Sequence, residues 1–420
     1  MILSQHPVLG RRAATTVFLA FAAAYFLSAL IRAITATLAP TLTQAFALQA
    51  RDLGLLAGGY FLGFSLMQLP LGTWLDRHGP KRVILCFLAV AVVGCLAFSF
   101  ATSFFALFAA RVLCGVGVSA CLMAPLTGYR RWFAPTAQMR ANSWMLMTGA
   151  LGMVASTLPV QWLMPLTGWR PLFWGLALLV LLAMAGIAWA VPRWETMVQE
   201  AGPATPTQPL VPAGYAAIRA HPYFRKMVPL GFFSYGGLVA MQTLWAAPWM
   251  VKVAGYSPLQ AATGLFWINV AMLCTFWVWG LVSPWLARRS ISADRLMAWG
   301  LPFSFLFLAI ILIAGSAYSA WAGLLWALYC MGCTFVSLSQ PAIAMAFPSA
   351  LAGRALSAYN LVIFVGVFVI QWGIGLLIDG FKALGLTEVL SFQLAFGIYL
   401  GCGVVSYAYF LASKSHNQRS

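Results

Sequence analysis

The chain alternates between long apolar blocks and short polar connections. Each block is about 20 residues long, which is the length that a helix needs to cross about 30 Å of hydrocarbon. Inside a membrane every backbone amide must be bonded internally, so we expect helices, and the blocks are too long for the strands of a membrane barrel. The pattern predicts an all-α membrane protein of twelve transmembrane helices. The expected spans are 17–39, 53–75, 83–101, 104–129, 141–164, 171–191, 227–251, 261–286, 295–314, 320–346, 355–378 and 389–412.

A single long polar break divides these spans six and six. It includes the proline-rich stretch from Glu200 to Pro209, a composition typical of loops. We therefore expect an N-terminal six-helix half at 1–191, a cytoplasmic linker at 192–226 and a C-terminal six-helix half at 227–420.

The two halves carry a short similar sequence at equivalent positions. The connections that precede the fifth and eleventh spans read Phe133-Ala-Pro135 with Arg140-Ala-Asn-Ser143, and Phe347-Pro348 with Arg354-Ala-Leu-Ser357. Duplicated halves of this kind place a binding site between them, near the middle of the membrane.

Composition agrees with a membrane solvent, because 62% of the residues are hydrophobic and only 7% are charged, against about a quarter in soluble proteins. The net charge of +17 lies in clusters between the blocks. With both termini in the cytoplasm, 18 Lys and Arg residues face the cytoplasm and four face the other side, namely Arg51, Arg170, Lys252 and Lys382. This asymmetry is a topology signal, so we predict a multi-pass protein of the cytoplasmic (inner) membrane and no nucleic-acid partner.

The chain offers little for enzymatic chemistry. Its eight cysteines lie within apolar stretches, and the Cys330-Met-Gly-Cys333 sequence indicates packing rather than a redox or metal motif. We find no metal-ligand cluster and no nucleophile beside a base. The sequence therefore predicts a protein that is not an enzyme, with no cofactor and no metal.

One loop carries a recognisable motif. Between the second and third spans the chain reads Gly72-Thr-Trp-Leu-Asp76-Arg77-His-Gly79-Pro-Lys81-Arg82. This resembles the signature loop of the major facilitator superfamily (MFS), with all six fixed positions present. The resemblance covers essentially the whole chain. It implies two pseudo-symmetric six-helix halves and secondary transport of a small molecule by alternating access.

The same loop predicts a conformational latch between the halves. Glycine at position 72 allows close helix approach, and glycine at position 79 allows a tight turn. We expect Asp76 to dock onto the N-terminus of the eleventh span near Ala355, where the helix dipole is positive, or onto Arg130 or Arg131, when the protein opens outward. The latch residues are Gly72, Asp76, Arg77, Gly79, Arg82 and Arg130.

Two arginines lie within spans, Arg32 in the first and Arg111 in the fourth. Each lies about seven residues from the outer end of its span, or roughly 10 Å into the membrane. Cations at this depth are costly and should face a wet cavity. No Asp, Glu or His lies near the middle of a span, so we expect the substrate to supply the negative charge. The planar guanidinium suits carboxylate or phosphate oxygens, which favours a small organic anion.

Further intramembrane residues are candidates for the same site. Together with the two arginines, the predicted substrate-binding set is Tyr25, Arg32, Arg111, Gln242, Trp245, Asn269 and Asn360. The stretch from Tyr25 to Arg32 resembles the first helix of organic-anion and organophosphate carriers. However, the phosphate exchangers of that group carry an arginine in the seventh span, which this chain lacks. Arg111 belongs to Arg111-x-x-x-Gly115-x-Gly117, similar to a fourth-helix motif of the superfamily whose arginine is often structural.

Several alternatives stay open at this point. Asp52, beside Arg51, is a possible proton site, although facilitated diffusion or exchange would need none. A carrier of a neutral or amphiphilic solute, with both arginines held structurally, is the second hypothesis. A transporter-like ligand sensor is a third, from a different class. The expected partners are a small anionic substrate, the lipid bilayer and, if transport is coupled, protons, and we expect a monomer.

Overall fold

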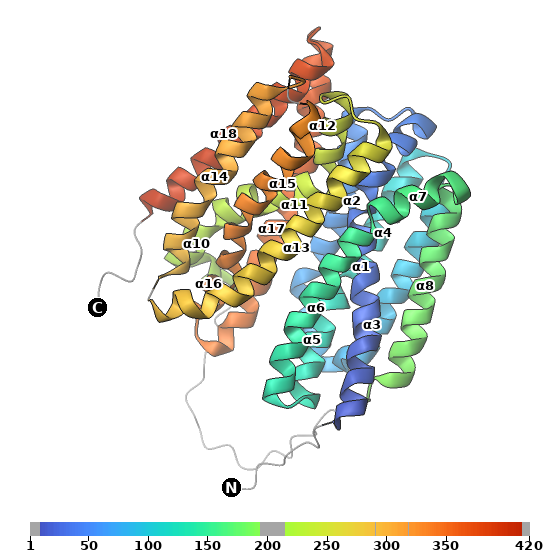
Figure 1. The fold of residues 1–420 in the computed structure, drawn as a ribbon. Helices are drawn as coiled ribbons and strands as arrows, with labels where there is room; N and C mark the ends of the chain where they lie inside the picture. The colour runs from blue at the N-terminus through green and yellow to red at the C-terminus, as the bar shows by residue number, and fades with distance from the viewer. Residues whose placement is uncertain (1–8, 194–214, 290, 318, 414–420) are drawn as a thin grey trace.

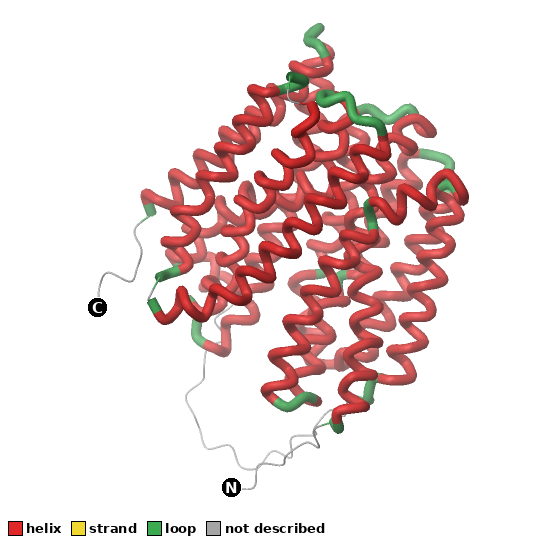
Figure 2. Tube along the Cα trace, viewed as in Figure 1, coloured by secondary structure: helices red, strands yellow, loops and turns green. Residues whose placement is uncertain are grey.

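The computed structural model describes residues 9–193, 215–289, 291–317 and 319–413, and all the regular elements in these ranges are helical (Figures 1 and 2). We refer to the described residues up to 193 as the first half and to those from 215 onward as the second half. The first half comprises α1 (Arg11–Phe46), α2 (Ala50–Leu66), α3 (Gln68–Phe100), α4 (Phe104–Val118), α5 (Ala120–Trp132), α6 (Pro135–Ala155), α7 (Leu158–Thr167) and α8 (Trp169–Ala190).

The second half is more interrupted. Its elements are α9 (Tyr215–Ala220), α10 (Pro222–Leu230), η1 (Gly231–Tyr235), α11 (Gly236–Ala240), η2 (Met241–Trp245), α12 (Ala246–Lys252), α13 (Pro258–Arg288), α14 (Ala293–Ala314), η3 (Ser319–Trp321), α15 (Ala322–Cys333), η4 (Thr334–Leu338), α16 (Ser339–Met345), α17 (Ser349–Ala383) and α18 (Glu388–Ala412).

Within the described ranges, ten helical segments are long and apolar enough to cross a membrane, and the pair α6 and α7, bent by 43°, makes an eleventh. The count is lower than the expected twelve because of α2 and α3. Helix α2 has only 17 residues, while α3 runs on through a break at Gly79, where φ is 75° and ψ is 160°. Positive φ of this kind favours glycine. The protein is therefore an all-helical, multi-pass membrane protein. The break between the expected second and third spans lies at Gly79, inside α3, and not at the end of α2.

The expected linker at 192–226 is partly helical. Residues 194–214 lie outside the described residues, but α9 begins at Tyr215 and α10 begins at Pro222. Proline is favoured in the first turn of a helix, where its missing amide hydrogen has no partner to lose. The seventh span therefore begins about a turn earlier than the position 227 that hydropathy indicated.

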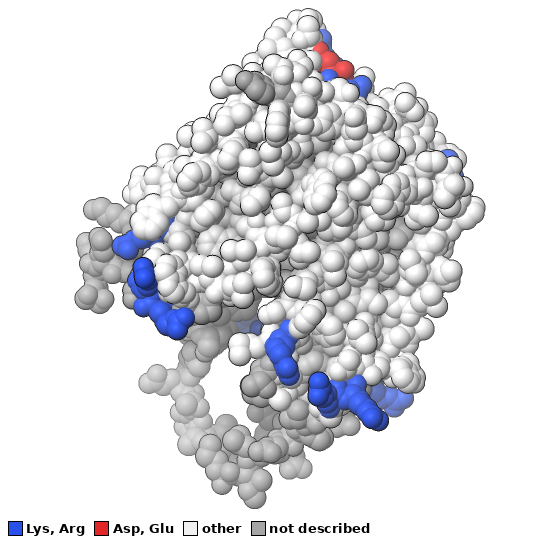
Figure 3. Space-filling view, viewed as in Figure 1, with Lys and Arg blue, Asp and Glu red and all other residues white. Residues whose placement is uncertain are grey.

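The two ends of the bundle differ in charge. Lys and Arg side chains gather at the end where α1 begins and α18 ends, and the acidic side chains visible in Figure 3 lie at the opposite end. We refer to these as the basic end and the far end. At the basic end the surface is hollowed between basic clusters (Figure 3). There α5 packs on α1, α3 and α6, and α16 packs on α10, α14 and α17, each within its own half.

At the far end the halves meet closely through α2 and α17. A Cβ atom at Gly54 would overlap the carbonyl oxygen of Gln371, and one at Gly375 would overlap that of Ala50. Deeper in the bundle, Phe364 of α17 packs on Phe64 with ring centroids 4.5 Å apart. Since helices in lipid associate by close packing of small residues, this contact closes the far end.

The side-chain carboxylate of Asp379 adds a polar tie to the same contact. Its two oxygens accept hydrogen bonds from the backbone amides of Ala50 at 3.2 Å and Arg51 at 2.8 Å. Those amides lie in the first turn of α2, where helix N–H groups lack partners within the helix and the dipole favours negative charge. A residue of one half therefore caps a helix of the other.

The glycine contact predicts a sharp difference between two neighbouring substitutions in α17. Gly375→Ala should force α2 and α17 apart at the far end, because the new Cβ would meet the backbone of Ala50. Gly373→Ala is the matched control, since a Cβ there would meet no atom within 4 Å. Hydrogen–deuterium exchange of the first turns of α2 should be faster in Gly375→Ala only. Equal exchange in both variants would contradict this account of the closure.

Candidate functional site

The interior between the halves contains a cluster of one arginine and three tyrosines. Arg32 of α1 forms a side-chain hydrogen bond with Tyr25 of the same helix and interacts electrostatically with Tyr60 of α2 and Tyr235 of η1. The side chain of Arg32 is partly accessible, although its Nε atom is buried and has no hydrogen-bond partner. No ion pair among the described residues includes Arg32. A buried donor without an acceptor is unfavourable, so this guanidinium is suited to a ligand that brings one.

A chain of polar contacts extends this cluster into the second half. The hydroxyl of Tyr235 donates to the side-chain oxygen of Gln340 at 3.4 Å. The amide nitrogen of Gln340, at the start of α16, donates to the side-chain oxygen of Asn360 on α17 at 2.7 Å. Tyr235 and Gln340 both keep part of their surface accessible. The predicted residues Tyr25, Arg32 and Asn360 thus belong to one polar network that crosses the boundary between the halves.

Irregular helical turns position part of this network. The seventh span contains two π-helical segments, η1 ending at Tyr235 and η2 ending at Trp245. Such segments are rare and occur often at functional sites. Pro248 has no amide hydrogen for the carbonyl of Leu244, four residues earlier, and its ring crowds that carbonyl, which accounts for the disturbed turn at η2.

Gln242 and Asn269 form a separate pair. The amide nitrogen of Gln242 donates to the side-chain oxygen of Asn269 on α13 at 2.8 Å, and the Asn269 amide nitrogen donates to the carbonyl of Leu265 at 2.8 Å. Both side chains are buried. This pair ties η2 to α13 and is not joined to the Arg32 cluster by a hydrogen bond between described residues.

Trp245 lies apart from Arg32 as well. Its indole nitrogen donates to the carbonyl of Gln371 on α17 at 3.1 Å, and its ring packs edge-on against Phe392 and Phe396 of α18. The side chain also lines a cleft at the far end. Trp245 therefore forms a wall near the far end.

Arg111 of α4 is fully buried, unlike Arg32. One terminal nitrogen donates to the carbonyl of Ile31 at 2.9 Å, and the guanidinium lies over the ring of Tyr60, 5.2 Å from its centroid. Its Nε and Nη2 atoms have no hydrogen-bond partner. Arg111 is positioned to hold α1 and α2, which carry Arg32 and Tyr60, against α4.

The predicted latch residues lie at the basic end, where the halves are apart. Asp76, Arg77, Arg82 and Arg130 are exposed, and no ion pair between described residues includes Asp76. A Cβ at Gly72 would meet nothing within 4 Å, so the close helix approach expected there is absent in this arrangement. The latch was predicted for the opposite conformation, in which this end is closed.

Asp52 has a local structural role. Its carboxylate accepts a hydrogen bond from the backbone amide of Gln49 at 3.0 Å, within a capping box at the start of α2, and it lies 3.8 Å from the exposed guanidinium of Arg51. Its use as a proton site stays a prediction.

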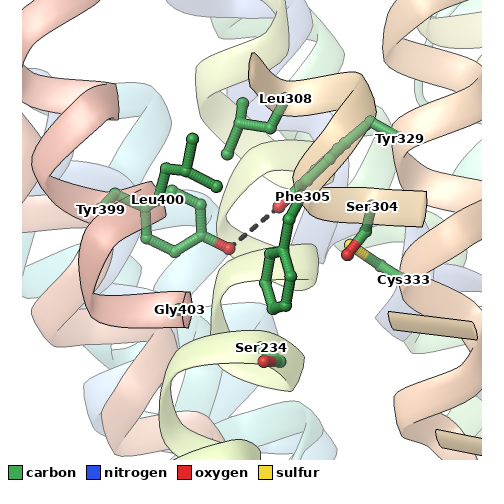
Figure 4. Close-up of a pocket in the computed structure, with 9 residues that line it drawn as sticks. All are labelled: Ser234, Ser304, Phe305, Leu308, Tyr329, Cys333, Tyr399, Leu400 and Gly403. Atoms are coloured by element: carbon green, nitrogen blue, oxygen red, sulfur yellow. Dashed lines mark hydrogen bonds between the residues drawn. The ribbon is translucent and has the colours of Figure 1, made fainter. Parts of the chain in front are cut away.

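A small pocket inside the second half does not fit a substrate. Its lining residues include Ser234, Phe305, Leu308 and Tyr399. The hydroxyls of Tyr329 and Tyr399 form a hydrogen bond of 2.9 Å at this pocket (Figure 4). Its volume is about 10 Å³, close to the lower limit for a single water molecule. Likewise, no group of three potential metal ligands occurs among the residues described.

An all-helical membrane bundle with a polar cluster in its interior is the architecture of many membrane carriers. The chain belongs to the Major Facilitator Superfamily, which it matches over residues 21–371. The chain is accordingly a membrane transporter and not an enzyme.

Individual relatives are distant. The chain is 28% identical over 221 residues to the inner membrane transport protein YajR of Escherichia coli (strain K12), covering 51% of this chain and 46% of that protein. It is 27% identical over 135 residues to the uncharacterized transporter YybO of Bacillus subtilis (strain 168), covering 32% and 31%. The aligned regions thus span less than half the length of these relatives.

Solved structures share the fold. A bacterial homologue of the human lysosomal transporter Spinster, in an inward-facing and unoccupied conformation, has a TM-score of 0.77 and 18% identity, covering 96% of this chain and 98% of that one. A D-xylose–proton symporter has a TM-score of 0.79 and 14% identity, covering 96% and 98%. Nucleoside transporter NupG has a TM-score of 0.73 and 13% identity, covering 96% and 98%. At these identities the likeness concerns the fold alone.

Three residues of these contacts, Tyr235, Gln340 and Asp379, are not among the residues predicted from the sequence. Gln340 has one signal in the sequence, an amide within an apolar span directly before Pro341. Asp379 has none, because its partner amides lie more than 300 positions away.

The different surroundings of the two arginines predict different effects on stability. Arg111→Ala removes a buried hydrogen bond and leaves a void, at a cost of about 1–3 kcal/mol for the unmade bond alone. Because the unfolding entropy grows with chain length, we expect the Tm of this 420-residue chain in detergent to fall by roughly 1–4 °C. Arg32 keeps part of its surface accessible and has no hydrogen bond to a backbone carbonyl among the described residues, so Arg32→Ala should leave the Tm unchanged or higher. Thermal unfolding of both variants checks this, and an equal loss in both would contradict the distinction.

Proposed function

We propose that the chain is a secondary transporter that moves a small organic anion inward across the cytoplasmic membrane by alternating access. It acts as a monomer with both termini in the cytoplasm, and Arg32 is the principal charge clamp. The observation that carries the proposal is the state of Arg32, which lies between the halves, is partly accessible, and has a buried Nε atom without a partner.

The surroundings of Arg32 favour an anion for an electrostatic reason. The neighbouring groups are the hydroxyls of Tyr25, Tyr60 and Tyr235, which are polar but uncharged. A partly enclosed cation surrounded by neutral groups is stabilised by an incoming negative charge. Tyrosine hydroxyls can donate further hydrogen bonds to the same anion, so the cluster offers both charge and orientation.

The arrangement of the two ends fits one state of the proposed cycle. With the basic end in the cytoplasm, the closed far end faces outside and the Arg32 cluster is reached from the cytoplasm. In the opposite state α2 and α17 part at the far end, and Asp76 docks on the N-terminus of α17 at the basic end. A bound anion that contacts both halves would then favour the exchange between the two states.

The second candidate is a carrier of a neutral or amphiphilic solute. One observation favours it, the hydrogen bond from Arg111 to the carbonyl of Ile31, because it gives one arginine a purely structural partner. Arg32 has no equivalent bond to a carbonyl among the described residues. The proposal therefore depends on Arg32. Arg111 has a supporting role, because it holds α1 and α2, which carry Arg32 and Tyr60.

Proton coupling is a separable part of the proposal, with Asp52 as its acid. The carboxylate caps the start of α2, so its protonation would weaken one end of the far-end contact. Uptake driven by an imposed pH gradient, compared between wild type and Asp52→Asn, tests this part without affecting the anion assignment.

Uptake of radiolabelled organic anions into proteoliposomes tests the main proposal. Arg32→Ala should lower transport of the recognised anion by about 10- to 100-fold at subsaturating concentration, because a hydrogen bond to a charged group contributes about 1.5–3 kcal/mol. Arg32→Lys keeps the charge but loses the planar fork, and should retain an intermediate rate.

The matched control is Arg12→Ala, which removes an exposed arginine at the start of α1 and should transport as wild type does. Unchanged anion uptake in Arg32→Ala would refute the charge-clamp assignment. Stabilisation of the wild type by uncharged ligands alone, in a thermal-shift screen, would favour the neutral-solute carrier instead.

A further inference from the structure

A second cavity lies at the far end, separate from the Arg32 cluster. It is a cleft of about 1120 Å³ between the two halves, lined by α1 and α2 on one side and by α12, α17 and α18 on the other. None of Tyr25, Arg32, Tyr60 and Tyr235 lines it. Its volume is slightly above the usual range of about 300–1,000 Å³ for small-molecule sites.

The lining of the cleft has an apolar part and a charged part. Trp245, Pro248, Leu376 and Phe392 are among the apolar residues. The charged residues are the cations Arg51, Lys252 and Lys382 and the acids Asp379 and Glu388. Ligand sites commonly combine an apolar wall with a few charged groups that orient the ligand.

Both acids of the cleft are already engaged. Asp379 accepts hydrogen bonds from the backbone amides of Ala50 and Arg51. The single carboxylate of Glu388 is shared between Lys382 at 2.9 Å and Lys252 at 3.7 Å. Three cations thus face two acids, and one carboxylate serves two ammonium groups.

The cations of the cleft are accessible. The exposed fractions of the Arg51, Lys252 and Lys382 side chains are 54%, 49% and 41%. Exposed ion pairs of this kind are weak, so the lysines can turn toward a ligand. Positive charge above an apolar wall complements a molecule with an anionic group and an apolar body.

We propose that this cleft is a second binding site, which takes an amphiphilic organic anion from the far side. The inference rests on the proposed function insofar as the ligand belongs to the same chemical class as the transported anion. Arg51 belongs to the first half and the two lysines to the second, so a bound anion that contacts both draws the halves together. The anion therefore stabilises the arrangement in which the far end is closed.

Binding of 1-naphthalenesulfonate to the full chain in nanodiscs tests the proposal. The measurement uses the Arg32→Ala background, in which the central charge clamp is absent and binding reports the cleft. In that background Lys252→Gln/Lys382→Gln should raise the Kd by about tenfold or more, because charge-assisted contacts are lost. Glu388→Gln should lower the Kd, because it removes the carboxylate that competes for both lysines.

The matched control is Arg11→Gln/Arg12→Gln, which removes the same number of charges from exposed positions at the start of α1 and should leave the Kd unchanged. The neutral analogue 1-naphthalenemethanol should bind at least tenfold more weakly than the sulfonate. An unchanged Kd in the lysine variant, or equal binding of the neutral analogue, would overturn the proposal. Normal anion uptake by Arg32→Ala would overturn the central assignment and leave the cleft result standing.

Discussion

The contact between α2 and α17 at the far end is the constraint on which the arrangement of the two halves depends. Helices in a membrane gain nothing from hiding apolar surface from lipid, so close packing and polar ties decide which of them touch. Here Gly54 and Gly375 let the two backbones approach, and the carboxylate of Asp379 binds the free amides of α2. The two halves are therefore held together at the far end.

The two intramembrane arginines illustrate how strongly surroundings decide a role. Both belong to the first half, and Tyr60 lies next to both of them. Arg111 is fully buried and donates a hydrogen bond to the carbonyl of Ile31, so its guanidinium interacts with the protein itself. Arg32 interacts electrostatically with Tyr235 of the second half, keeps part of its surface accessible, and has a buried Nε atom without a hydrogen-bond partner. A shared depth therefore does not imply a shared function.

Hydropathy predicted the helical class and most spans, because the membrane imposes the same length and the same internal hydrogen bonding on every crossing segment. The glycine at position 79 was also predictable, since the motif demands a turn there. The rotation of each helix about its own axis could not be predicted from the sequence. For this reason Arg32 and Arg111, which lie at the same expected depth, could not be told apart by their surroundings. The π-helical turns that place Tyr235 and Trp245, and the pairing of Asp379 with α2, depend on neighbours distant in sequence and leave no periodic pattern.

Helix α17 is the element on which these features converge. Near the basic end it begins at Ser349, the terminus onto which Asp76 would dock in the opposite state. Midway it carries Asn360, which accepts a hydrogen bond from Gln340 in the polar network. Toward the far end it offers the carbonyl of Gln371 to Trp245, and its last turns hold Asp379 against α2.

A single movement of α17 relative to α2 would therefore affect three features at once. It would break the far-end contact, change the position of Trp245 and shift the polar network that contains Asn360. Packed helices move largely as rigid bodies between discrete arrangements, so these events are coupled by the stiffness of one helix and need no separate signal. Trp245, which lines the far-end cleft, is hydrogen-bonded to the carbonyl of Gln371 on the same helix, so this movement would also change the shape of the cleft.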